Sequence, residues 1–277
     1  MNRAIDTFNA GLSSIMEIIL APLGLFPQGA QLVIVSLVAG VVLVLLYGRI
    51  SSQTRLRLVK QQIYASLLEA ILFRHDPKVT LRAQARMLRL ASLYFCYAVP
   101  SVAVLAIPCV ILLGQLNIRY GSRPLPLDRD TIVTAAFRNG DFLEKLALEG
   151  GEGIEVVTPP VRVLEVPSAA WRIRPKASGK QPIAITSGGR VLAEGEIEAG
   201  AGSAPGIVSN RVSEWWLSLL YPGSRLLGPE SNVAELQIAY PDAEYGILGM
   251  QWHWIIVFFV FSFLSALIAG KFCKVEL

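Results

Sequence analysis

The stretch from Arg49 to Leu116 constrains this chain most, because a strongly basic segment runs directly into a long apolar one. Residues 49–91 contain nine Lys or Arg and only two acidic residues, a net charge of +7, whereas the whole chain carries +4. Short loops rich in Lys and Arg stay on the cytoplasmic side of a membrane. We therefore predict that this loop is cytoplasmic and that it sets the orientation of every other segment.

Three segments without Asp, Glu, Lys or Arg predict three transmembrane helices, at residues 30–48, 93–117 and 249–270. The eighteen residues Ala30–Tyr47 would extend about 27 Å as a helix, close to the hydrocarbon thickness of about 30 Å. Aromatic residues gather at the two membrane interfaces. We therefore interpret three residues at the ends of the spans as interface anchors: Tyr47, Trp252 and Trp254.

Residues 49–92 are predicted to form a cytoplasmic helical hairpin. Apolar stripes at helical spacing run through 51–73 and 78–90, and Asp76-Pro77 between them has the pattern of a helix start. The cations of this hairpin either bind anionic lipid headgroups or another protein, or serve only to fix the topology. Those expected to face lipid or a partner are Arg49, Arg55, Arg57, Lys60, Arg82, Arg86 and Arg89.

The second predicted span contains Pro100 and Pro108, eight residues apart and hence on nearly the same helix face. Each proline frees a carbonyl and favours a kink. The pair would either open a groove or only bend the helix around a partner. The second interpretation is favoured, because prolines are common in membrane helices.

Residues 1–29 are predicted to form an amphipathic helix lying in the membrane interface, ended by Pro22 and Gly24. The alternative is that the helix packs on a partner or on the outer domain. No cleavable leader is expected, because Asp6 and Glu17 interrupt the start. The apolar stripe consists of Ile5, Phe8, Leu12, Ile15, Met16, Ile19 and Leu23.

Residues 118–248 change character and predict an extracytoplasmic antiparallel β-sandwich of immunoglobulin-like type, which makes the whole chain an α+β membrane protein. Trp171, in the middle of an alternating run, is the expected core anchor. Trp215 and Trp216 lie on a short predicted helix, 213–220, where one should pack and the other should contact a partner or the membrane. Residues 271–277 form a cytoplasmic tail. The predicted strands are 131–138, 154–158, 161–166, 170–174, 183–186, 191–197 and 233–240.

The sequence contains no specific catalytic or cofactor motif. Glu194, Glu196 and Glu198 alternate on a predicted strand, which would suit a cation but is more typical of a solvated face. The two histidines and three cysteines are dispersed. We expect no enzyme activity, cofactor, metal site or nucleic-acid partner. No ionisable residue lies inside a predicted span, which argues against an ion-coupled transporter.

The order of these parts resembles the Oxa1/YidC/Get1/EMC3 membrane-insertase superfamily over about half of the chain. An amphipathic helix, a first span, a basic hairpin, a second span and a last span correspond to Asn2–Leu23, Ala30–Tyr47, Ser51–Leu90, Leu93–Leu116 and Gly249–Ala269. The resemblance implies a role in receiving apolar segments of new membrane proteins. The start of the predicted cytoplasmic loop, Ser51-Ser52-Gln53, is also similar to that of uncharacterised bacterial membrane proteins.

The favoured hypothesis is a non-enzymatic scaffold or assembly subunit of a bacterial inner-membrane complex, with the β domain recruiting a partner outside. Its partners would be the membrane, including anionic lipid at the cytoplasmic face, and other integral membrane proteins or further copies of the chain. The alternative is an insertase or holdase similar to the superfamily named above. An enzyme acting on lipid or cell-wall material has the least support.

Overall fold

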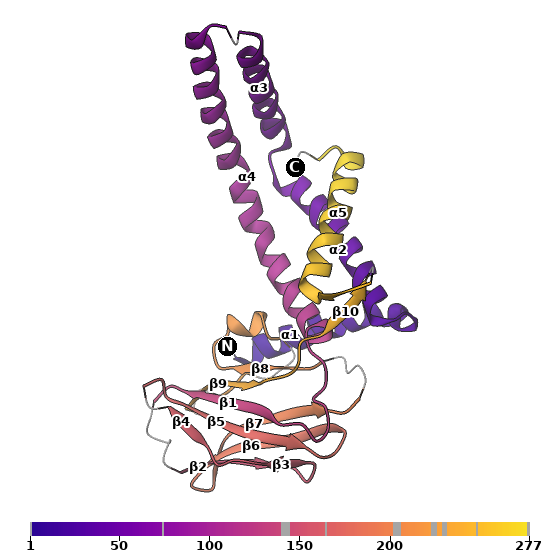
Figure 1. Ribbon diagram of the computed structural model, residues 1–277, viewed down its shortest axis with the longest axis vertical. Coiled ribbons are helices and arrows are strands. Elements are labelled where there is room, and N and C mark those ends of the chain that lie inside the picture. The colour runs from indigo at the N-terminus through magenta and orange to yellow at the C-terminus, as the bar shows by residue number, and fades with distance from the viewer. Residues whose placement is uncertain are drawn as a thin grey trace. The chain divides into compact units, whose positions relative to one another are not determined.

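The chain folds as an α+β protein with two compact units, shown in the computed structural model of Figure 1. The β unit comprises Met1–Gln31 and Val110–Ile255, and the helical unit comprises Leu32–Cys109 and Ile256–Leu277. The structure describes residues 2–73, 75–139, 145–163, 165–201, 206–222, 226–228, 232–247 and 249–275, without the side chains of 2–6, 8 and 219.

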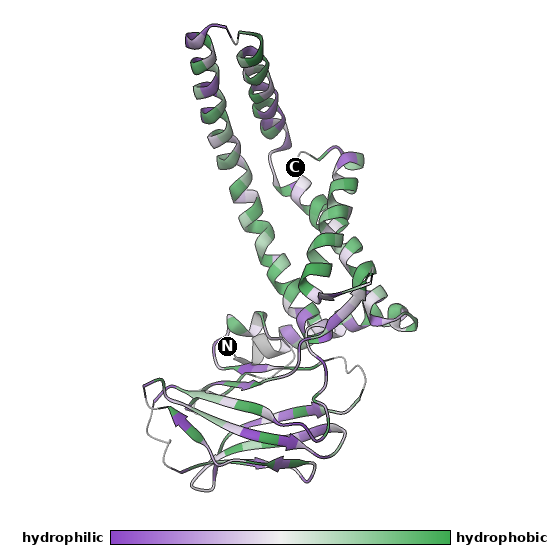
Figure 2. Cartoon of the chain, viewed as in Figure 1, coloured by the Kyte–Doolittle hydropathy of each residue, from purple (hydrophilic) through white to green (hydrophobic). Residues whose placement is uncertain are grey.

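Three helices are long and apolar enough to cross a membrane: α2 (Gln28–Ile50), α4 (Pro77–Tyr120) and α5 (Trp254–Cys273). Figure 2 shows the long apolar stretches of these helices in green. Two further helices are α1 (Asn2–Leu20), followed by a 3-10 turn η1 (Ala21–Leu25), and α3 (Gln53–Leu72). The three predicted spans are therefore present as apolar helices.

The second helix of the predicted hairpin and the second predicted span form one continuous helix, α4, of 44 residues. The Asp76 carboxylate accepts the Lys78 backbone N–H at 2.9 Å and caps its start. Residues 90–93 contain no Gly or Pro, so nothing there breaks the helix between its polar and apolar parts. At 1.5 Å per residue α4 is about 66 Å long, roughly twice the hydrocarbon thickness of a bilayer.

The third span begins later than the sequence predicts. Residues Met250–His253 form a strand, β11, which pairs with β10 (Glu244–Ile247) in an antiparallel hairpin. Gly249 lies in the connection with a φ of +80°, which glycine adopts without strain. The helix α5 therefore starts at Trp254, and the predicted start at residue 249 is corrected.

The β unit contains two antiparallel sheets. One sheet has the order β3-β5-β1-β9-β8, with β4 also paired to β5, and the other has the order β2-β6-β7. The strands are β1 (Thr131–Phe137), β2 (Leu146–Gly150), β3 (Ile154–Val156), β4 (Val161–Val163), β5 (Ser168–Pro175), β6 (Gly179–Ser187), β7 (Arg190–Ala199), β8 (Asn210–Val212) and β9 (Val233–Ile238). All seven predicted strands are present, and sequence reasoning missed β2 and β8.

Both sheets contribute to one hydrophobic core, which includes Trp171 from β5, Ile185 from β6 and Leu236 from β9. Trp171 is 1% exposed, as its mid-strand position predicts. The β6–β7 hairpin turns at Gly188 and Gly189, with φ of +57° and +84°. Two consecutive positive φ angles are typical of the tight hairpin turns that favour glycine, so this turn was predictable from the sequence.

Candidate membrane interface and docking surfaces

The helix α1 turns polar side chains toward the rest of the β unit. The Asn9 side chain is 3% exposed, and its amide donates to the Ser218 carbonyl at 3.2 Å. Ser13, one turn further on, donates to the Gln115 side-chain oxygen at 3.1 Å. Asn9 and Ser13 are four residues apart and so share one face. Sequence reasoning placed both residues off the apolar stripe but did not identify their partners; their spacing was the available signal.

The same helix exposes apolar side chains. Ile15, Ile18 and Ile19 are 54%, 74% and 60% exposed, and Leu25 in η1 is 93% exposed. The apolar stripe is thus confirmed at Ile15 and Ile19, whereas the side chains of Ile5 and Phe8 lie outside the described residues. In water this arrangement, polar groups inward and isoleucines outward, is unfavourable.

Trp215 and Trp216 add to the exposed apolar surface of the β unit. They are 52% and 51% exposed, so the prediction that one of them packs is wrong. The predicted helix 213–220 is reduced to a 3-10 turn, η3 (Leu217–Leu219). The Ser218 hydroxyl donates to the Trp215 carbonyl at 2.6 Å. Because Asn9 of α1 donates to Ser218, the tryptophan pair and α1 are joined through one residue.

A buried polar cluster holds the end of α4 in the β unit. The Tyr120 hydroxyl donates to the Gln31 side-chain oxygen at 3.4 Å, and Gln31 donates to the Phe26 carbonyl at 2.8 Å. The Tyr245 hydroxyl donates to the Tyr120 carbonyl at 3.1 Å. These bonds join α4, the start of α2 and β10. Gln115 is also buried, and its amide nitrogen has no partner among the described residues.

In the helical unit, α2 and α5 meet at small residues. A Cβ built on Gly40 would lie 2.1 Å from both the Ser262 carbonyl oxygen and the Ser265 hydroxyl. Small residues let membrane helices approach backbone to backbone. The Ser265 hydroxyl donates to the Ser262 carbonyl at 2.9 Å, so its polar group is satisfied within α5. Sequence reasoning missed this crossing, although Gly40, Ser262 and Ser265 stand out in otherwise large apolar runs.

The apolar part of α4 is much less covered by the chain than those of the other two spans. Only 6% of its most apolar window is buried, against 39% for α2 and 28% for α5. Pro100 and Pro108 lie inside this helix with exposed side chains. Neither carries an N–H, so the carbonyls of Cys96 and Val104 have no α-helical donor. The predicted kink stays a prediction.

The cations of α3 and the start of α4 lie largely on the surface. Arg49, Arg55, Arg57, Arg82, Arg86 and Arg89 are exposed and Lys60 is half-buried, whereas Arg74 is outside the described residues. Arg86 pairs with Glu69 at 2.9 Å, which joins α4 to α3. The Arg55 guanidinium lies 5.7 Å from the centre of the Tyr97 ring. Leu68, Leu72, Leu81 and Leu88 of the same helices are also exposed. This surface therefore mixes charge with apolar area.

The three predicted anchors lie near helix ends, and none of them is exposed. Tyr47 is 7% and Trp254 is 3% exposed, whereas Trp252 is half-buried and donates its indole N–H to the Ile247 carbonyl at 3.2 Å. His253 accepts the Ile255 backbone N–H at 3.3 Å, so one ring nitrogen is engaged at the start of α5.

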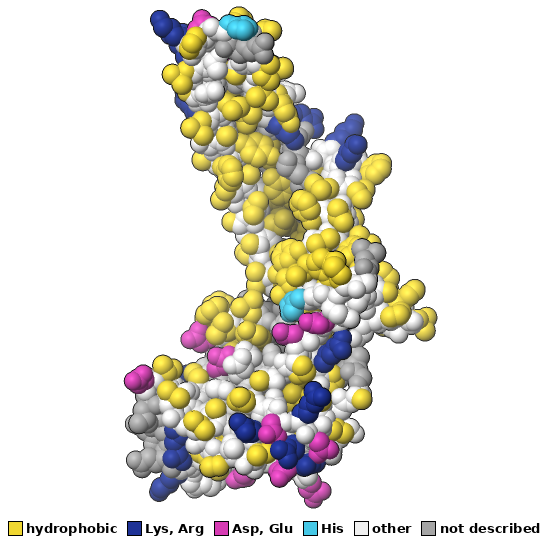
Figure 3. Space-filling model, in the orientation of Figure 1, with side chains coloured by type: hydrophobic (Ala, Val, Ile, Leu, Met, Phe, Trp, Pro, Cys, Tyr) yellow, Lys and Arg dark blue, Asp and Glu magenta, His cyan; other side chains and the backbone are white. Residues whose placement is uncertain are grey.

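No cluster of His, Cys, Asp or Glu suited to a metal ion occurs in the described part of the chain. Glu194, Glu196 and Glu198 project from one face of β7 and are at least partly exposed. Figure 3 shows charged side chains on the β unit and at the helix ends, with apolar side chains covering much of the helices between.

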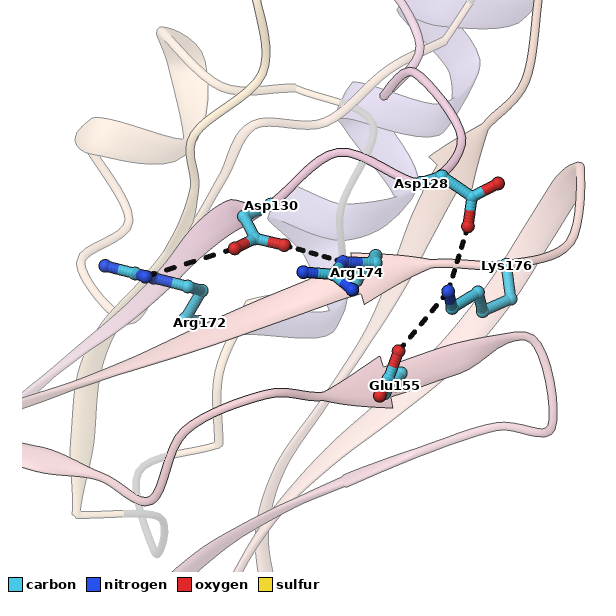
Figure 4. Close-up of polar contacts among 6 residues, drawn as sticks. All are labelled: Asp128, Asp130, Glu155, Arg172, Arg174 and Lys176. Atoms are coloured by element: carbon cyan, nitrogen blue, oxygen red, sulfur yellow. Dashed lines mark hydrogen bonds and ion pairs between the residues drawn. The ribbon is translucent and has the colours of Figure 1, made fainter.

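An exposed face of the β5 sheet carries a row of ion pairs (Figure 4). Arg174 donates to Asp130 at 2.7 Å, and Lys176 lies 2.9 Å from Asp128 and 3.5 Å from Glu155. The hydrogen bond from Arg174, and then the nearby positive charges, lower the pKa of Asp130 below its usual value. Because these groups are exposed to water, the pairs contribute little to stability.

Comparison with known proteins adds no family: no protein-family model, curated protein or solved structure matches this chain.

Proposed function

We propose that the protein is a non-enzymatic scaffold or assembly subunit of a bacterial inner-membrane complex, held by α2, α4 and α5. In this proposal α3 and the first part of α4 form the cytoplasmic hairpin. The β unit presents its strands outside as an immunoglobulin-like sandwich, and α1 lies in the outer interface. The observation that carries the proposal is the nearly uncovered apolar part of α4, in which two prolines remove the α-helical donors of two carbonyls.

Lipid tails cover apolar side chains well but offer no hydrogen-bond donor to a free carbonyl. Pro100 and Pro108 leave the Cys96 and Val104 carbonyls without their helical donors, and the Cys96, Pro100, Val104 and Pro108 side chains are exposed. A neighbouring membrane helix with a Ser, Thr, Asn or Gln would supply such donors. We therefore assign this face of α4 to contact with another membrane protein or a second copy of the chain.

Two features support the proposed orientation and the proposed membrane contact. The exposed cations of α3 and the start of α4 belong to the loop with net charge +7, which should remain in the cytoplasm. The outward isoleucines of α1, together with Trp215 and Trp216, suit the headgroup region, where a polar back and an apolar front are both satisfied.

The mass of the intact protein in mild detergent, measured by light scattering, tests the scaffold. We expect a stoichiometric partner or a homo-oligomer, and Val104→Trp should weaken it because a larger side chain would stand on the contact face. Ile268→Trp is the matched control, since Ile268 is 61% exposed on α5. A clean monomer of the unsubstituted protein would contradict the proposal.

An insertase or holdase is the second candidate, favoured by the mixed basic and apolar surface of α3 and α4. Arg82 and Arg89 are exposed beside Leu81 and Leu88, a combination that suits apolar segments flanked by anionic lipid or acidic residues. Liposomes containing the protein should speed insertion of a small tail-anchored substrate, and Arg82→Glu/Arg89→Glu should remove the effect. No gain over empty liposomes rejects this candidate.

A further inference from the structure

A cleft of about 860 Å³ is lined by residues of all three strands of the second sheet, β2, β6 and β7, and includes the edge where β7 has a neighbour on one side only. Glu194, Gly195 and Glu196 of β7 line it, as do Ile207, from the segment that leads into β8, and Arg211 of β8. Leu236 and Tyr240 also line the cleft. Its size lies within the range of about 300–1,000 Å³ typical of ligand-binding clefts.

The backbone of β7 offers free hydrogen-bonding groups to this cleft. At one end of the strand the edge is already occupied: the Glu198 N–H donates to the Tyr240 hydroxyl at 2.9 Å, and the Glu198 carbonyl accepts the Leu125 N–H at 3.0 Å. In an antiparallel pair, alternate residues direct both backbone groups to the same side. Glu196 and Glu194 therefore direct their N–H and C=O away from β6, toward the open edge.

The single pairing at Leu125 shows how this edge accepts a further strand. Leu125 makes a parallel bridge with Ala199, and the Gly200 N–H returns a hydrogen bond to the Leu125 carbonyl at 2.9 Å. The chain then leaves the edge, because Ser122 bridges to Asp242 and the Arg123 N–H donates to the Pro241 carbonyl. Among the residues that the structure describes, no strand pairs with the edge from Glu196 toward Arg190. Its seven residues correspond to roughly 23 Å of extended chain.

The cleft is lined by four glutamates and two cations, Lys180 and Arg211, so its net charge is negative. Glu198 lies opposite Lys180 in the strand register, and Glu149 accepts a hydrogen bond from Thr186. Glu194 and Glu196 face Ala184 and Pro182 instead, so neither glutamate has a cation opposite it in the strand register. An incoming strand with a positive side chain at every second position would place those charges beside the two carboxylates.

We infer that an extended, cationic segment of a partner protein adds as a strand to the open edge of β7, with its backbone paired to Glu194 and Glu196 and its basic side chains beside their carboxylates. Main-chain hydrogen bonds supply much of the affinity in this mode of recognition, and the side chains supply the specificity. The inference rests on the proposed scaffold function, because it names the kind of partner that the outer domain recruits.

The test uses a fluorescent peptide of alternating Lys and Val, titrated against the full chain in nanodiscs of neutral phosphatidylcholine. Neutral lipid removes the electrostatic attraction of the peptide to the bilayer. We expect saturable binding, and about a tenfold or larger loss of affinity with Glu194→Gln/Glu196→Gln. Glu165→Gln/Glu244→Gln makes the same change of charge outside the cleft and should leave binding unchanged.

Two further measurements separate strand addition from charge attraction alone. A peptide N-methylated on the backbone nitrogens facing β7 keeps its charge but loses its donors, so it should bind poorly. In hydrogen exchange the amides of Glu194 and Glu196 should become protected when the unmodified peptide binds. Equal binding of the methylated peptide, no effect of Glu194→Gln/Glu196→Gln, or no binding at about 1 mM overturns the inference.

The outcomes also separate this inference from the scaffold proposal. An assembly that stays intact in detergent while the peptide fails to bind overturns strand addition alone. A monomer that binds the peptide overturns the scaffold alone.

Discussion

Trp171 of the β unit and Phe263 of the helical unit are both large aromatic residues on regular elements, yet their surroundings are opposite. Trp171 is 1% exposed in a core shared by two sheets, whereas Phe263 is 64% exposed on α5. The two sheets of the β unit enclose a hydrophobic core and carry ion pairs on an exposed face. The helices of the other unit expose apolar side chains, as Figure 3 illustrates. Water favours the first arrangement, and lipid favours the second.

The comparison also shows where each unit obtains its stability. In the β unit, alternating strand residues close a core without a disulfide, and the cysteines that the structure describes are all free. In the helical unit, contact depends on local features such as the crossing at Gly40, because burial of apolar area does not drive association between helices in lipid. A core substitution should therefore damage the first unit most, and a small-to-large change should damage the second.

The largest effect is expected for Trp171→Ala. Loss of a buried aromatic side chain costs about 3–5 kcal/mol of unfolding free energy, enough to unfold many single domains. Denaturant unfolding of the full chain, followed by near-ultraviolet circular dichroism, measures it. Trp215→Ala is the matched control, since Trp215 is 52% exposed, and it should change stability little. Equal losses for the two variants would remove the contrast between core and surface.

Gly40→Val should destabilise the crossing of α2 and α5 by about 1–3 kcal/mol, the usual range for overpacking. The added Cβ would meet backbone at Ser262, which is harder to move than the end of a flexible side chain. Unfolding in mixed detergent micelles measures the change. Val42→Leu, at a position 48% exposed on the same helix, should be tolerated. A stable Gly40→Val protein would mean that the two helices do not pack at this point.

A smaller effect is expected at the proposed membrane interface. Lipids brominated near the headgroup should quench the fluorescence of Trp215 and Trp216, measured as the difference in quenching between the protein and its Trp215→Phe/Trp216→Phe variant. Ile18→Ser/Ile19→Ser should weaken this quenching, because α1 would lose much of its apolar face. Ser14→Ala is the control for a change on the same helix. Quenching of the tryptophan pair that is independent of α1, or absent, would contradict a shared interface.

The smallest effect is expected for Asp130→Asn on the water-exposed face of the β unit. Its pKa is lowered in the folded state from an ordinary 3.8, so the unfolded chain binds the proton more readily at acid pH. The small stabilisation from the pairs with Arg174 and Arg172 is present above about pH 4 and is lost as the pH falls through the lowered pKa. We therefore expect the Tm of the unsubstituted protein and that of Asp130→Asn, measured between about pH 2 and pH 7, to converge at the acid end. A difference in Tm that stays constant over this pH range would exclude titration of Asp130 as the cause of that difference.

Hydrophobic pattern and charge account for most of what the sequence predicted. Short runs of β-forming residues located all seven predicted strands. Apolar length located the three long helices. The hydrophobic pattern located the apolar stripe on α1 but not the helix face that packs against the protein. Asn9 and Ser13 are polar, so their residue types do not distinguish contact with water from contact with Ser218 and Gln115.

Other features depend on contacts between residues far apart in the chain. The β10–β11 hairpin was read as the start of a span, since Met250 and Trp252 suit a strand and a membrane interface equally well. The cleft beside β7 needs residues from β7, β8 and β9 together, and the crossing at Gly40 needs α5 more than 200 positions later. Neither local propensity nor spacing carries such information.

The central claim is that the basic hairpin and the β unit lie on opposite sides of a membrane. Single cysteines in place of Lys78 and Glu165, in a protein whose own cysteines are replaced by Ser, can be labelled with an impermeant maleimide on cells whose outer membrane has been opened. The account predicts labelling of Glu165→Cys in intact inner membranes, and of Lys78→Cys only after those membranes are permeabilised. The reverse pattern, or labelling of both from one side, would contradict it.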